Sequence, residues 1–106
     1  MVKNGMRPVH PGEILLEEFM KGSDSPINAN TLAKALEVPA NRITAIIKGQ
    51  RGITGDTAVR LAAFFSTTAE FWMNLQKTYE LRLAEQALPE KIRKHIEEKR
   101  SVPALA

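Results

Sequence analysis

The stretch NTLAKALEVPANRITAIIK, residues 30–48, decides the fold. Leu32, Ala33 and Leu36 give its first part a one-sided apolar face, which predicts a short helix capped by a preceding asparagine, Asn28 or Asn30. Pro39 disfavours helical angles at the residue before it, so this helix ends near Leu36 and a second helix begins beside the proline. A connection of three or four residues forces two short helices to cross steeply, which predicts a helix-turn-helix unit.

The second helix of this unit is expected to end at about Lys48. Ile43, Ile46 and Ile47 are spaced so that they share one side of it, and we predict that this side is buried. Ala33 lies where the two helices are expected to cross. A small side chain is needed at that point, because a larger one would push the helices apart.

A continuous stripe of a different chemistry remains on the outer side of the second helix. Its members recur at i, i+3, i+4 and i+7 and are Asn41, Thr44, Ala45 and Lys48. An amide pairs with an adenine edge, a hydroxyl bonds a base or a phosphate, a methyl packs on thymine, and an ammonium neutralises a phosphate. A solvated helix face is the alternative for the stripe taken alone.

The charge around this helix favours the DNA interpretation over a merely solvated face. Residues 38–68 contain one acid, Asp56, and the basic residues Arg42, Lys48, Arg51 and Arg60. Phosphates attracted to these cations would supply affinity, while the stripe would supply the choice of sequence.

The rest of the chain is also expected to be helical, because no alternating strand pattern of useful length occurs. His10 and Pro11 open one helix, Thr54 begins another, and Thr67 with Glu70 has the spacing of a capping box for a helix reaching Gln86. The charged stretch that Pro89 begins is predicted to form a weak sixth helix, and its apolar side is limited to Leu88, Ile92 and Ile96. The predicted fold class is therefore all-α. Its parts are an extended arm (1–9), a five-helix DNA-binding domain (10–87) and a C-terminal helical extension with a frayed tail (88–106).

The composition excludes several kinds of site. The chain has 106 residues, no cysteine and a net charge of +3, so disulfides, thiolate zinc sites and cysteine nucleophiles are absent. No apolar stretch of membrane-spanning length occurs. Of the two histidines, His10 is expected to cap a helix and His95 lies in a charged stretch, and neither has carboxylates at ligand spacing. We therefore expect no catalytic residues, no metal and no cofactor.

Several blocks of the sequence together resemble one family. They are HPGEIL (10–15), LA to VP (32–39), NRI (41–43), GQRGIT (49–54) and EFWMNLQ (70–76). In this order they resemble the HigA antitoxins, lambda-repressor-like helix-turn-helix proteins of the branch also labelled virulence-associated protein I. The resemblance covers about residues 8–86.

The resemblance implies a cytoplasmic homodimer that binds a palindromic DNA operator and represses its own operon. It also implies binding and neutralisation of HigB, a RelE-like toxin that cleaves mRNA on the ribosome. Carried over residue by residue, it assigns base or backbone contact to Ala40, Asn41, Thr44, Ala45 and Lys48, and phosphate contact to Asn30, Arg42 and Arg51.

One position departs from the family pattern. Glu37 stands where the family usually has glycine, whose left-handed backbone angles carry no penalty. A glutamate in that conformation is strained by about 1 kcal/mol, so we expect the turn to open differently. Its negative charge also opposes DNA at this turn.

The partner surfaces are predicted less sharply. The helix that reaches Gln86 carries an apolar seam that is wider than the first helix alone would need to cover. Its members are Trp72, Leu75, Tyr79 and Leu83. For three of them, Trp72, Tyr79 and Leu83, contact with a second copy and burial in the core are equally expected. Phe71 and Leu75 are assigned to the core. The two candidate surfaces for the toxin are the arm and residues 90–100. The alternative for residues 90–100 is a solvated helix without a partner, because interleaved charges of this kind are usual on such helices.

Two further functions remain open at this stage. A solitary repressor without a toxin would use the same stripe and dimer, and a RelE-like reading frame beside this one would distinguish the two. A helical adaptor that contacts only protein predicts no salt-dependent DNA binding.

Overall fold

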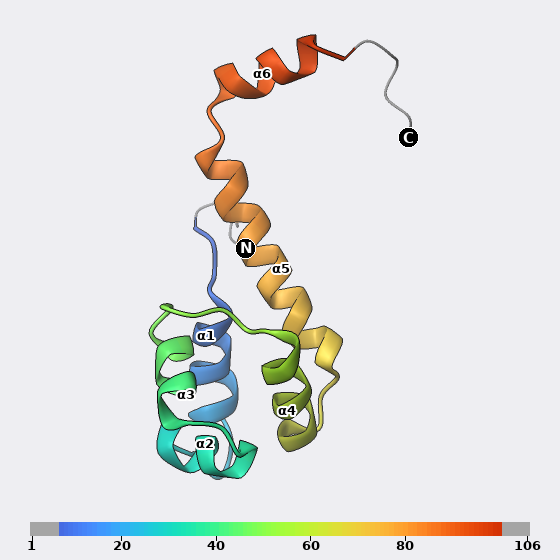
Figure 1. Ribbon diagram of the computed structural model, residues 1–106. Coiled ribbons are helices and arrows are strands. Elements are labelled where there is room, and N and C mark those ends of the chain that lie inside the picture. Colours follow the sequence, from blue (N-terminus) through green and yellow to red (C-terminus); the bar gives the residue numbers. More distant parts are fainter. Residues whose placement is uncertain (1–6, 101–106) are drawn as a thin grey trace.

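The computed structural model describes residues 7–100, and within them helices are the only regular secondary structure (Figure 1). The elements are α1 (Pro11–Ile14) continuing into a π-helix η1 (Leu15–Met20), α2 (Ala29–Leu36), α3 (Ala40–Ile47), α4 (Gly55–Phe65), α5 (Ala69–Ala87) and α6 (Glu90–Glu98). This confirms the predicted all-α class. The predicted arm falls mostly, and the predicted tail wholly, outside the described residues.

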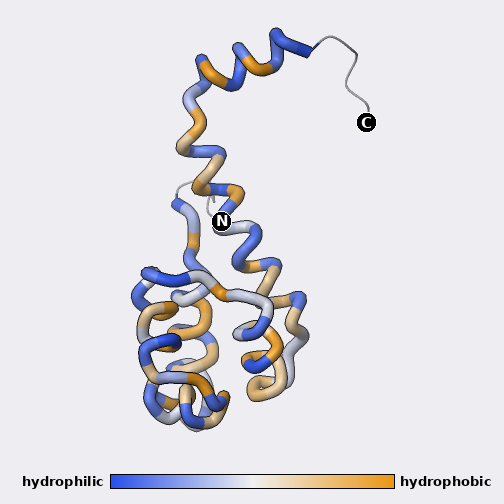
Figure 2. Tube along the Cα trace, viewed as in Figure 1, coloured by the Kyte–Doolittle hydropathy of each residue, from blue (hydrophilic) through white to orange (hydrophobic). Residues whose placement is uncertain are grey.

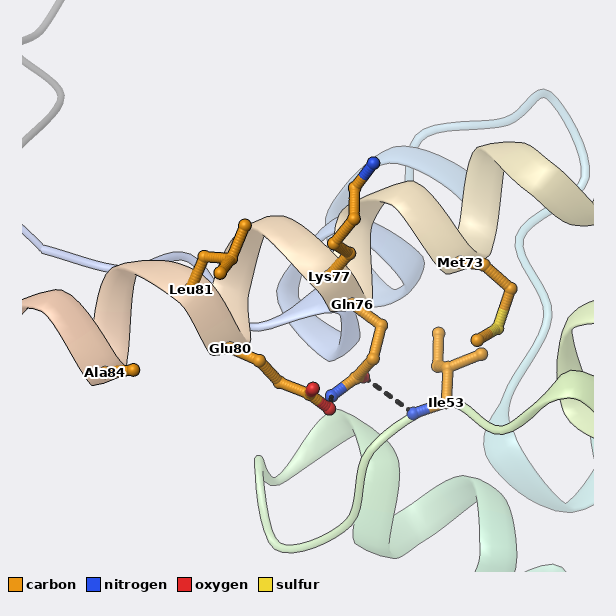
Figure 3. A pocket seen from close by; sticks show the side chains of 7 residues that line it. All are labelled: Ile53, Met73, Gln76, Lys77, Glu80, Leu81 and Ala84. Atoms are coloured by element: carbon orange, nitrogen blue, oxygen red, sulfur yellow. Dashed lines mark hydrogen bonds between the residues drawn. The ribbon is translucent and has the colours of Figure 1, made fainter. Parts of the chain in front are cut away.

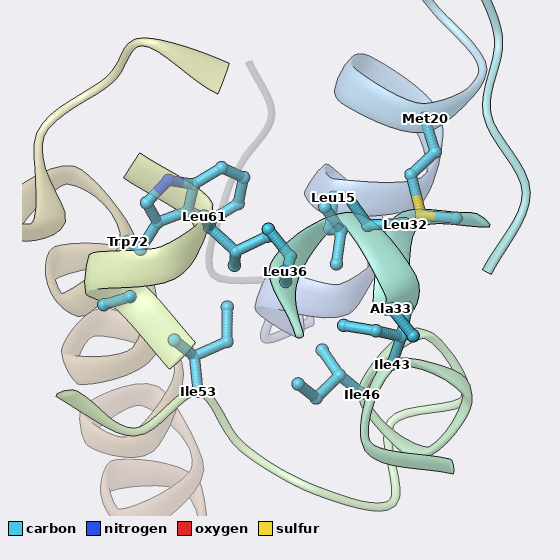
Figure 4. Close-up of a cluster of buried hydrophobic side chains, with 11 residues drawn as sticks. Leu15, Met20, Leu32, Ala33, Leu36, Ile43, Ile46, Ile53, Leu61 and Trp72 are labelled. Atoms are coloured by element: carbon cyan, nitrogen blue, oxygen red, sulfur yellow. The ribbon is translucent and has the colours of Figure 1, made fainter. Parts of the chain in front are cut away.

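A single apolar core joins η1, α2, α3, α4 and α5 (Figure 4). Its buried members are Leu15, Met20, Leu32, Ala33, Leu36, Ile43, Ile46, Ile53, Ala58, Leu61 and Trp72. Each large apolar side chain removed from water contributes about 1.5–3 kcal/mol, so the core is the main force holding α2 and α3 together. The predicted inward faces of both helices are confirmed, with Ile47 only half-buried.

The first helix begins as predicted and then widens. The backbone N–H of Gly12 donates to His10 Nδ1 at 2.9 Å, so His10 is the N-cap and Pro11 occupies the first helical position. From Leu15 the helix has π geometry, in which an N–H bonds the carbonyl five residues earlier, as the N–H of Lys21 does to Leu16 at 2.9 Å. Leu15 and Met20 are both buried, and Phe19 is half-buried and packs against the core.

The start of α5 differs from the prediction by one residue. Thr68 is the N-cap, because its Oγ1 accepts from the N–H of Phe71 at 3.0 Å. Thr67 instead accepts a hydrogen bond from the indole Nε1 of Trp72 at 2.7 Å. The prediction of a capping box at Thr67 was therefore wrong, because its hydroxyl oxygen accepts the buried indole N–H of Trp72 instead.

The apolar seam of α5 also divides differently from the prediction. Trp72 has no exposed surface, so it is a core residue and its proposed dimer contact is wrong. Phe71 is 37% exposed, which contradicts its assignment to the core, while Leu75 packs half-buried against the core.

The C-terminal part of the chain extends away from the body. Residues 80–100 are all exposed, and the apolar residues of this region colour separate orange stretches of the tube along α5 and α6 (Figure 2). Within residues 7–100, no helix combines the length and apolarity needed to cross a bilayer.

Candidate nucleic-acid interface

The turn between α2 and α3 is tight and left-handed. Glu37 has φ 60° and ψ 47°, and the N–H of Val38 donates to the carbonyl of Ala33 at 3.0 Å. Pro39, in extended conformation, then precedes the first residue of α3. The expectation that a glutamate at 37 would open the turn differently was wrong, because the chain adopts the conformation that glycine favours.

Arg60 of α4 holds this turn from outside it. Its Nη1 donates to the carbonyl of Leu36 at 2.7 Å and to that of Glu37 at 3.4 Å. Carbonyls at the end of a helix lack partners within the helix, and a cation there also interacts favourably with the helix dipole. From the sequence, Arg60 is recognisable only as a basic residue of the segment, and nothing in its spacing indicates this role.

The predicted stripe lies on the side of α3 that faces away from the core. Asn41 and Lys48 are exposed and Thr44 and Ala45 are half-buried, whereas Ile43 and Ile46 on the inner side have no exposed surface. Within residues 7–100, Lys48 takes part in no intramolecular ion pair. The stripe is therefore open to a partner.

Thr44 has its hydroxyl proton engaged within the helix. Oγ1 donates to the carbonyl of Ala40 at 3.1 Å, which leaves the lone pairs of the oxygen as acceptors. In this rotamer Thr44 can accept from an exocyclic amino group of adenine or cytosine. Such a group lies in the major groove, so the side chain is suited to a base edge more than to a phosphate.

Arg42 is less free than the sequence suggested. Its Nη1 lies 2.6 Å from Oδ2 of Asp56, and its side chain is only 24% exposed. Hydrogen bonds from Arg42 and then Arg60 hold the pKa of the Asp56 carboxyl below its ordinary value. The predicted phosphate contact of Arg42 thus competes with an ion pair inside the chain.

The other predicted contact residues are accessible. Ala40 is exposed at the start of α3, and Arg51 is exposed in the loop that follows this helix. Asn28, rather than Asn30, caps α2, since its Oδ1 accepts from the N–H of Thr31 at 2.8 Å. The side chain of Asn30 therefore remains exposed in the first turn of α2.

The loop after α3 is tied to α5 by Gln76. Oε1 of this buried glutamine accepts from the N–H of Ile53 at 2.8 Å, and Nε2 donates to Glu80 at the same distance (Figure 3). A Cβ at Gly52 would lie 2.7 Å from the Gln76 amide, so a side chain at position 52 would displace this amide. Apolar periodicity missed Gln76, because a polar residue on an inward face leaves no signal in that pattern.

The N-terminal end of α1 packs against the far end of α3. A Cβ built on Gly12 would lie 1.9 Å from the carbonyl oxygen of Ile46, so the two backbones are in direct contact. His10 beside it packs edge-on against Tyr79 at a ring-centroid distance of 4.8 Å. Burial lowers the pKa of His10, while Glu13 and a hydrogen bond with the Arg51 backbone act in the opposite direction.

Comparisons with known proteins agree in both sequence and structure. No family model matches the chain. It is 50% identical over 84 residues to virulence-associated protein I of Dichelobacter nodosus, covering 79% of this chain and 76% of that one. It is 43% identical over 75 residues to the uncharacterized helix-turn-helix-type transcriptional regulator YbaQ of Escherichia coli K12, covering 71% of this chain and 65% of that one.

A solved structure extends the likeness to nearly the whole chain. The antitoxin HigA of Pseudomonas aeruginosa, solved with the higBA promoter, superposes with a TM-score of 0.77 at 45% identity. The match covers 93% of this chain and all of that one. Of these relatives, YbaQ is named a transcriptional regulator and the Pseudomonas aeruginosa protein an antitoxin.

Proposed function

The chain belongs to the HigA family of helix-turn-helix antitoxins, and on this premise we propose that it binds an operator with α3 and represses the operon that encodes it. The observation that carries the proposal is the outer face of α3. This face presents an amide, a hydroxyl, a methyl and an ammonium, and it is exposed while the opposite face of the same helix is buried.

The roles of the stripe follow from its chemistry. Asn41 in the first turn of α3 reads an adenine edge, Thr44 accepts from a base amino group, and Ala45 packs against a thymine methyl. Lys48 at the far end neutralises a phosphate and supplies affinity without sequence preference. Asn30 and Arg51, on the elements that flank α3, add backbone contacts.

A palindromic operator needs a protein with two-fold symmetry. Two recognition helices one DNA turn apart lie about 34 Å from each other, which a dimer can arrange. We place the dimer surface on the C-terminal half of α5, which exposes apolar residues on two sides: Leu81, 51% exposed, on one side, and Leu83, 43% exposed, on the other side with Tyr79.

A hollow on α5 supports this placement. It measures about 430 Å³ and is lined by Ile53, Met73, Gln76, Lys77, Glu80, Leu81 and Ala84 (Figure 3). Side chains of a second copy would fill it and cover apolar surface that is otherwise exposed to water. Tyr79 belongs to the same interface only through its outer edge, since its ring is half-buried against His10.

The toxin partner follows from the family and not from a site in the chain. We propose a small RelE-like toxin, HigB, as the protein that this antitoxin neutralises. The outward-projecting α6, with Ile92 45% exposed and Ile96 57% exposed, is our candidate surface for it. This action on DNA and toxin places the protein in the cytoplasm.

A repressor without a toxin is the second candidate, and one observation favours it. YbaQ, at 43% identity, carries the name of a transcriptional regulator and not of an antitoxin. Both functions use the same face of α3, so the two differ only in whether a toxin is present.

One experiment tests the proposal and separates the two candidates. Overlapping duplexes that tile the DNA upstream of the gene are titrated with the protein, alone and with the product of the adjacent reading frame. We expect one duplex to bind with an affinity at least about a thousandfold above a scrambled duplex. Equal binding of all duplexes contradicts the proposal, and an adjacent product that does not bind the protein favours the solitary repressor.

A further inference from the structure

Arg60 is placed to do more than contribute positive charge. It belongs to α4, yet its guanidinium reaches the end of α2 and bonds the carbonyl of Leu36 at 2.7 Å and that of Glu37 at 3.4 Å. The same side chain bonds both oxygens of Asp56 through Nε, at 3.2 and 3.1 Å. Asp56 in turn bonds Nη1 of Arg42, in the first turn of α3.

We propose that Arg60 is a positioning residue for DNA recognition: it holds the α2–α3 turn in its left-handed conformation and, through Asp56, fixes the first turn of α3. This inference rests on the proposed function. It assigns no DNA contact to Arg60, because Nε and Nη1 of its side chain donate to groups within the chain.

The backbone at Glu37 explains why such a residue is needed. At φ 60° a side chain is strained, and glycine is the residue that avoids this penalty. With glutamate at this position, a contact from outside the turn offsets part of the penalty of the left-handed conformation. The guanidinium provides it, because the carbonyls of Leu36 and Glu37 come within reach of one Nη1 atom only while the chain folds back at residue 37.

The link through Asp56 carries the effect to the recognition helix. Arg42 is next to Asn41 in sequence, and its contact with Asp56 at 2.6 Å restrains the turn of α3 that carries the adenine-reading amide. A base contact depends on placing the side chain within hydrogen-bond reach of the base edge. Loosening either end of this link is therefore expected to weaken specific binding more than non-specific binding.

The test compares Arg60→Gln with two double variants that differ in one respect. Arg60→Gln combined with Glu37→Gly removes both the backbone strain and the charge at 37, whereas Arg60→Gln with Glu37→Gln removes the charge alone. The probes are the upstream duplex that the wild-type protein prefers and a scrambled duplex of the same composition. Circular dichroism checks the helical content of every variant, and urea unfolding measures its stability.

We expect Arg60→Gln to weaken binding of the preferred duplex about tenfold and binding of the scrambled duplex less than about threefold. The dependence of affinity on salt should stay unchanged, since loss of a phosphate contact would lower its slope by about one. Adding Glu37→Gly should restore most of the affinity, because glycine adopts the left-handed turn without help. Adding Glu37→Gln should restore much less.

Three results would overturn the inference. The first is unchanged affinity for the preferred duplex, the second is a salt slope reduced by about one, and the third is equal rescue by the two substitutions at 37. If Arg60→Gln does not fold, Arg60→Lys is used, and its rescue by Glu37→Gly is measured in the same way.

If wild-type protein binds no upstream duplex preferentially, the proposed function fails. The unfolding data then test the coupling alone, because a double-mutant cycle of Arg60→Gln and Glu37→Gly, completed by the Glu37→Gly single variant, must give a non-zero interaction energy if the two residues are coupled.

Discussion

Replacing Asn41 with alanine tests the assignment of α3 as the reading element. The residue is exposed in the first turn of this helix, and its neighbours Ile43 and Ile46 hold the helix in the core from the other side. The substitution removes one amide and leaves the buried face intact. Because alanine is a good helix former and the position is exposed, the free energy of unfolding should change by less than about 0.5 kcal/mol.

The expected effect on binding follows from what the amide can do. A bidentate contact of asparagine with adenine contributes about 1–3 kcal/mol of discrimination, which corresponds to about 5- to 150-fold in affinity. Only the duplex that carries the correct base should lose this amount. Binding to scrambled DNA depends on phosphates and should change little, since the amide carries no charge.

Fluorescence anisotropy with the preferred and the scrambled duplex, at one fixed salt concentration, measures both affinities. Asn74→Ala is the matched control, because Asn74 is an exposed asparagine on α5, away from the stripe. Equal loss of affinity for both duplexes would show that Asn41 does not read a base. A loss of similar size in the Asn74→Ala protein would show that the assay reports something other than the α3 surface.

Three further predictions concern stability and assembly. The pKa of His10 is lowered by burial in the folded chain, so the unfolded chain binds a proton more readily. The stabilisation should therefore be complete above about pH 6.5, decrease as the pH falls below this value, and be lost once the pH is below the pKa of the folded state. The melting temperature, measured across this pH range, follows the change. His10→Asn, which keeps an acceptor at the cap, should flatten that window, and an unchanged slope would show that another group titrates. Gly12→Ala should lower the free energy of unfolding, measured in urea, by more than about 2 kcal/mol, because the new Cβ would lie 1.9 Å from the Ile46 carbonyl oxygen. A loss below about 0.5 kcal/mol would contradict the close contact of α1 with α3. Leu83→Glu should convert the proposed dimer to monomer in sedimentation without changing the helical content, since Leu83 is 43% exposed. A dimer that persists in this variant would contradict an interface at Leu83.

Apolar periodicity predicted the core of the recognition unit correctly. Leu32, Leu36, Ile43 and Ile46 are buried as their spacing required, and the turn between the two helices lies where Pro39 placed it. These features are local: each depends on residues within one or two helical turns. The same reasoning failed for Trp72, because periodicity shows which side of a helix is apolar but not whether the chain itself or a second copy covers it.

The polar contacts of the interface were out of reach for a different reason. Arg42 and Asp56 are 14 positions apart, and Arg60 and Leu36 are 24 apart, so no spacing rule pairs them. The partial clue was the i, i+4 spacing of Asp56 and Arg60 on α4. The strain expected at Glu37 was a second clue, because a strained backbone that persists must be held by a neighbour.

The most direct test of the central claim maps the DNA contact on the protein itself. Backbone amide resonances of the labelled protein are followed by NMR while the preferred upstream duplex is added. The account predicts that the largest shifts occur in residues 40–48 and in the first turn of α2, with smaller shifts in the loop that carries Arg51. Large shifts confined to α5 or α6, with residues 40–48 unmoved, would contradict the claim that α3 binds DNA.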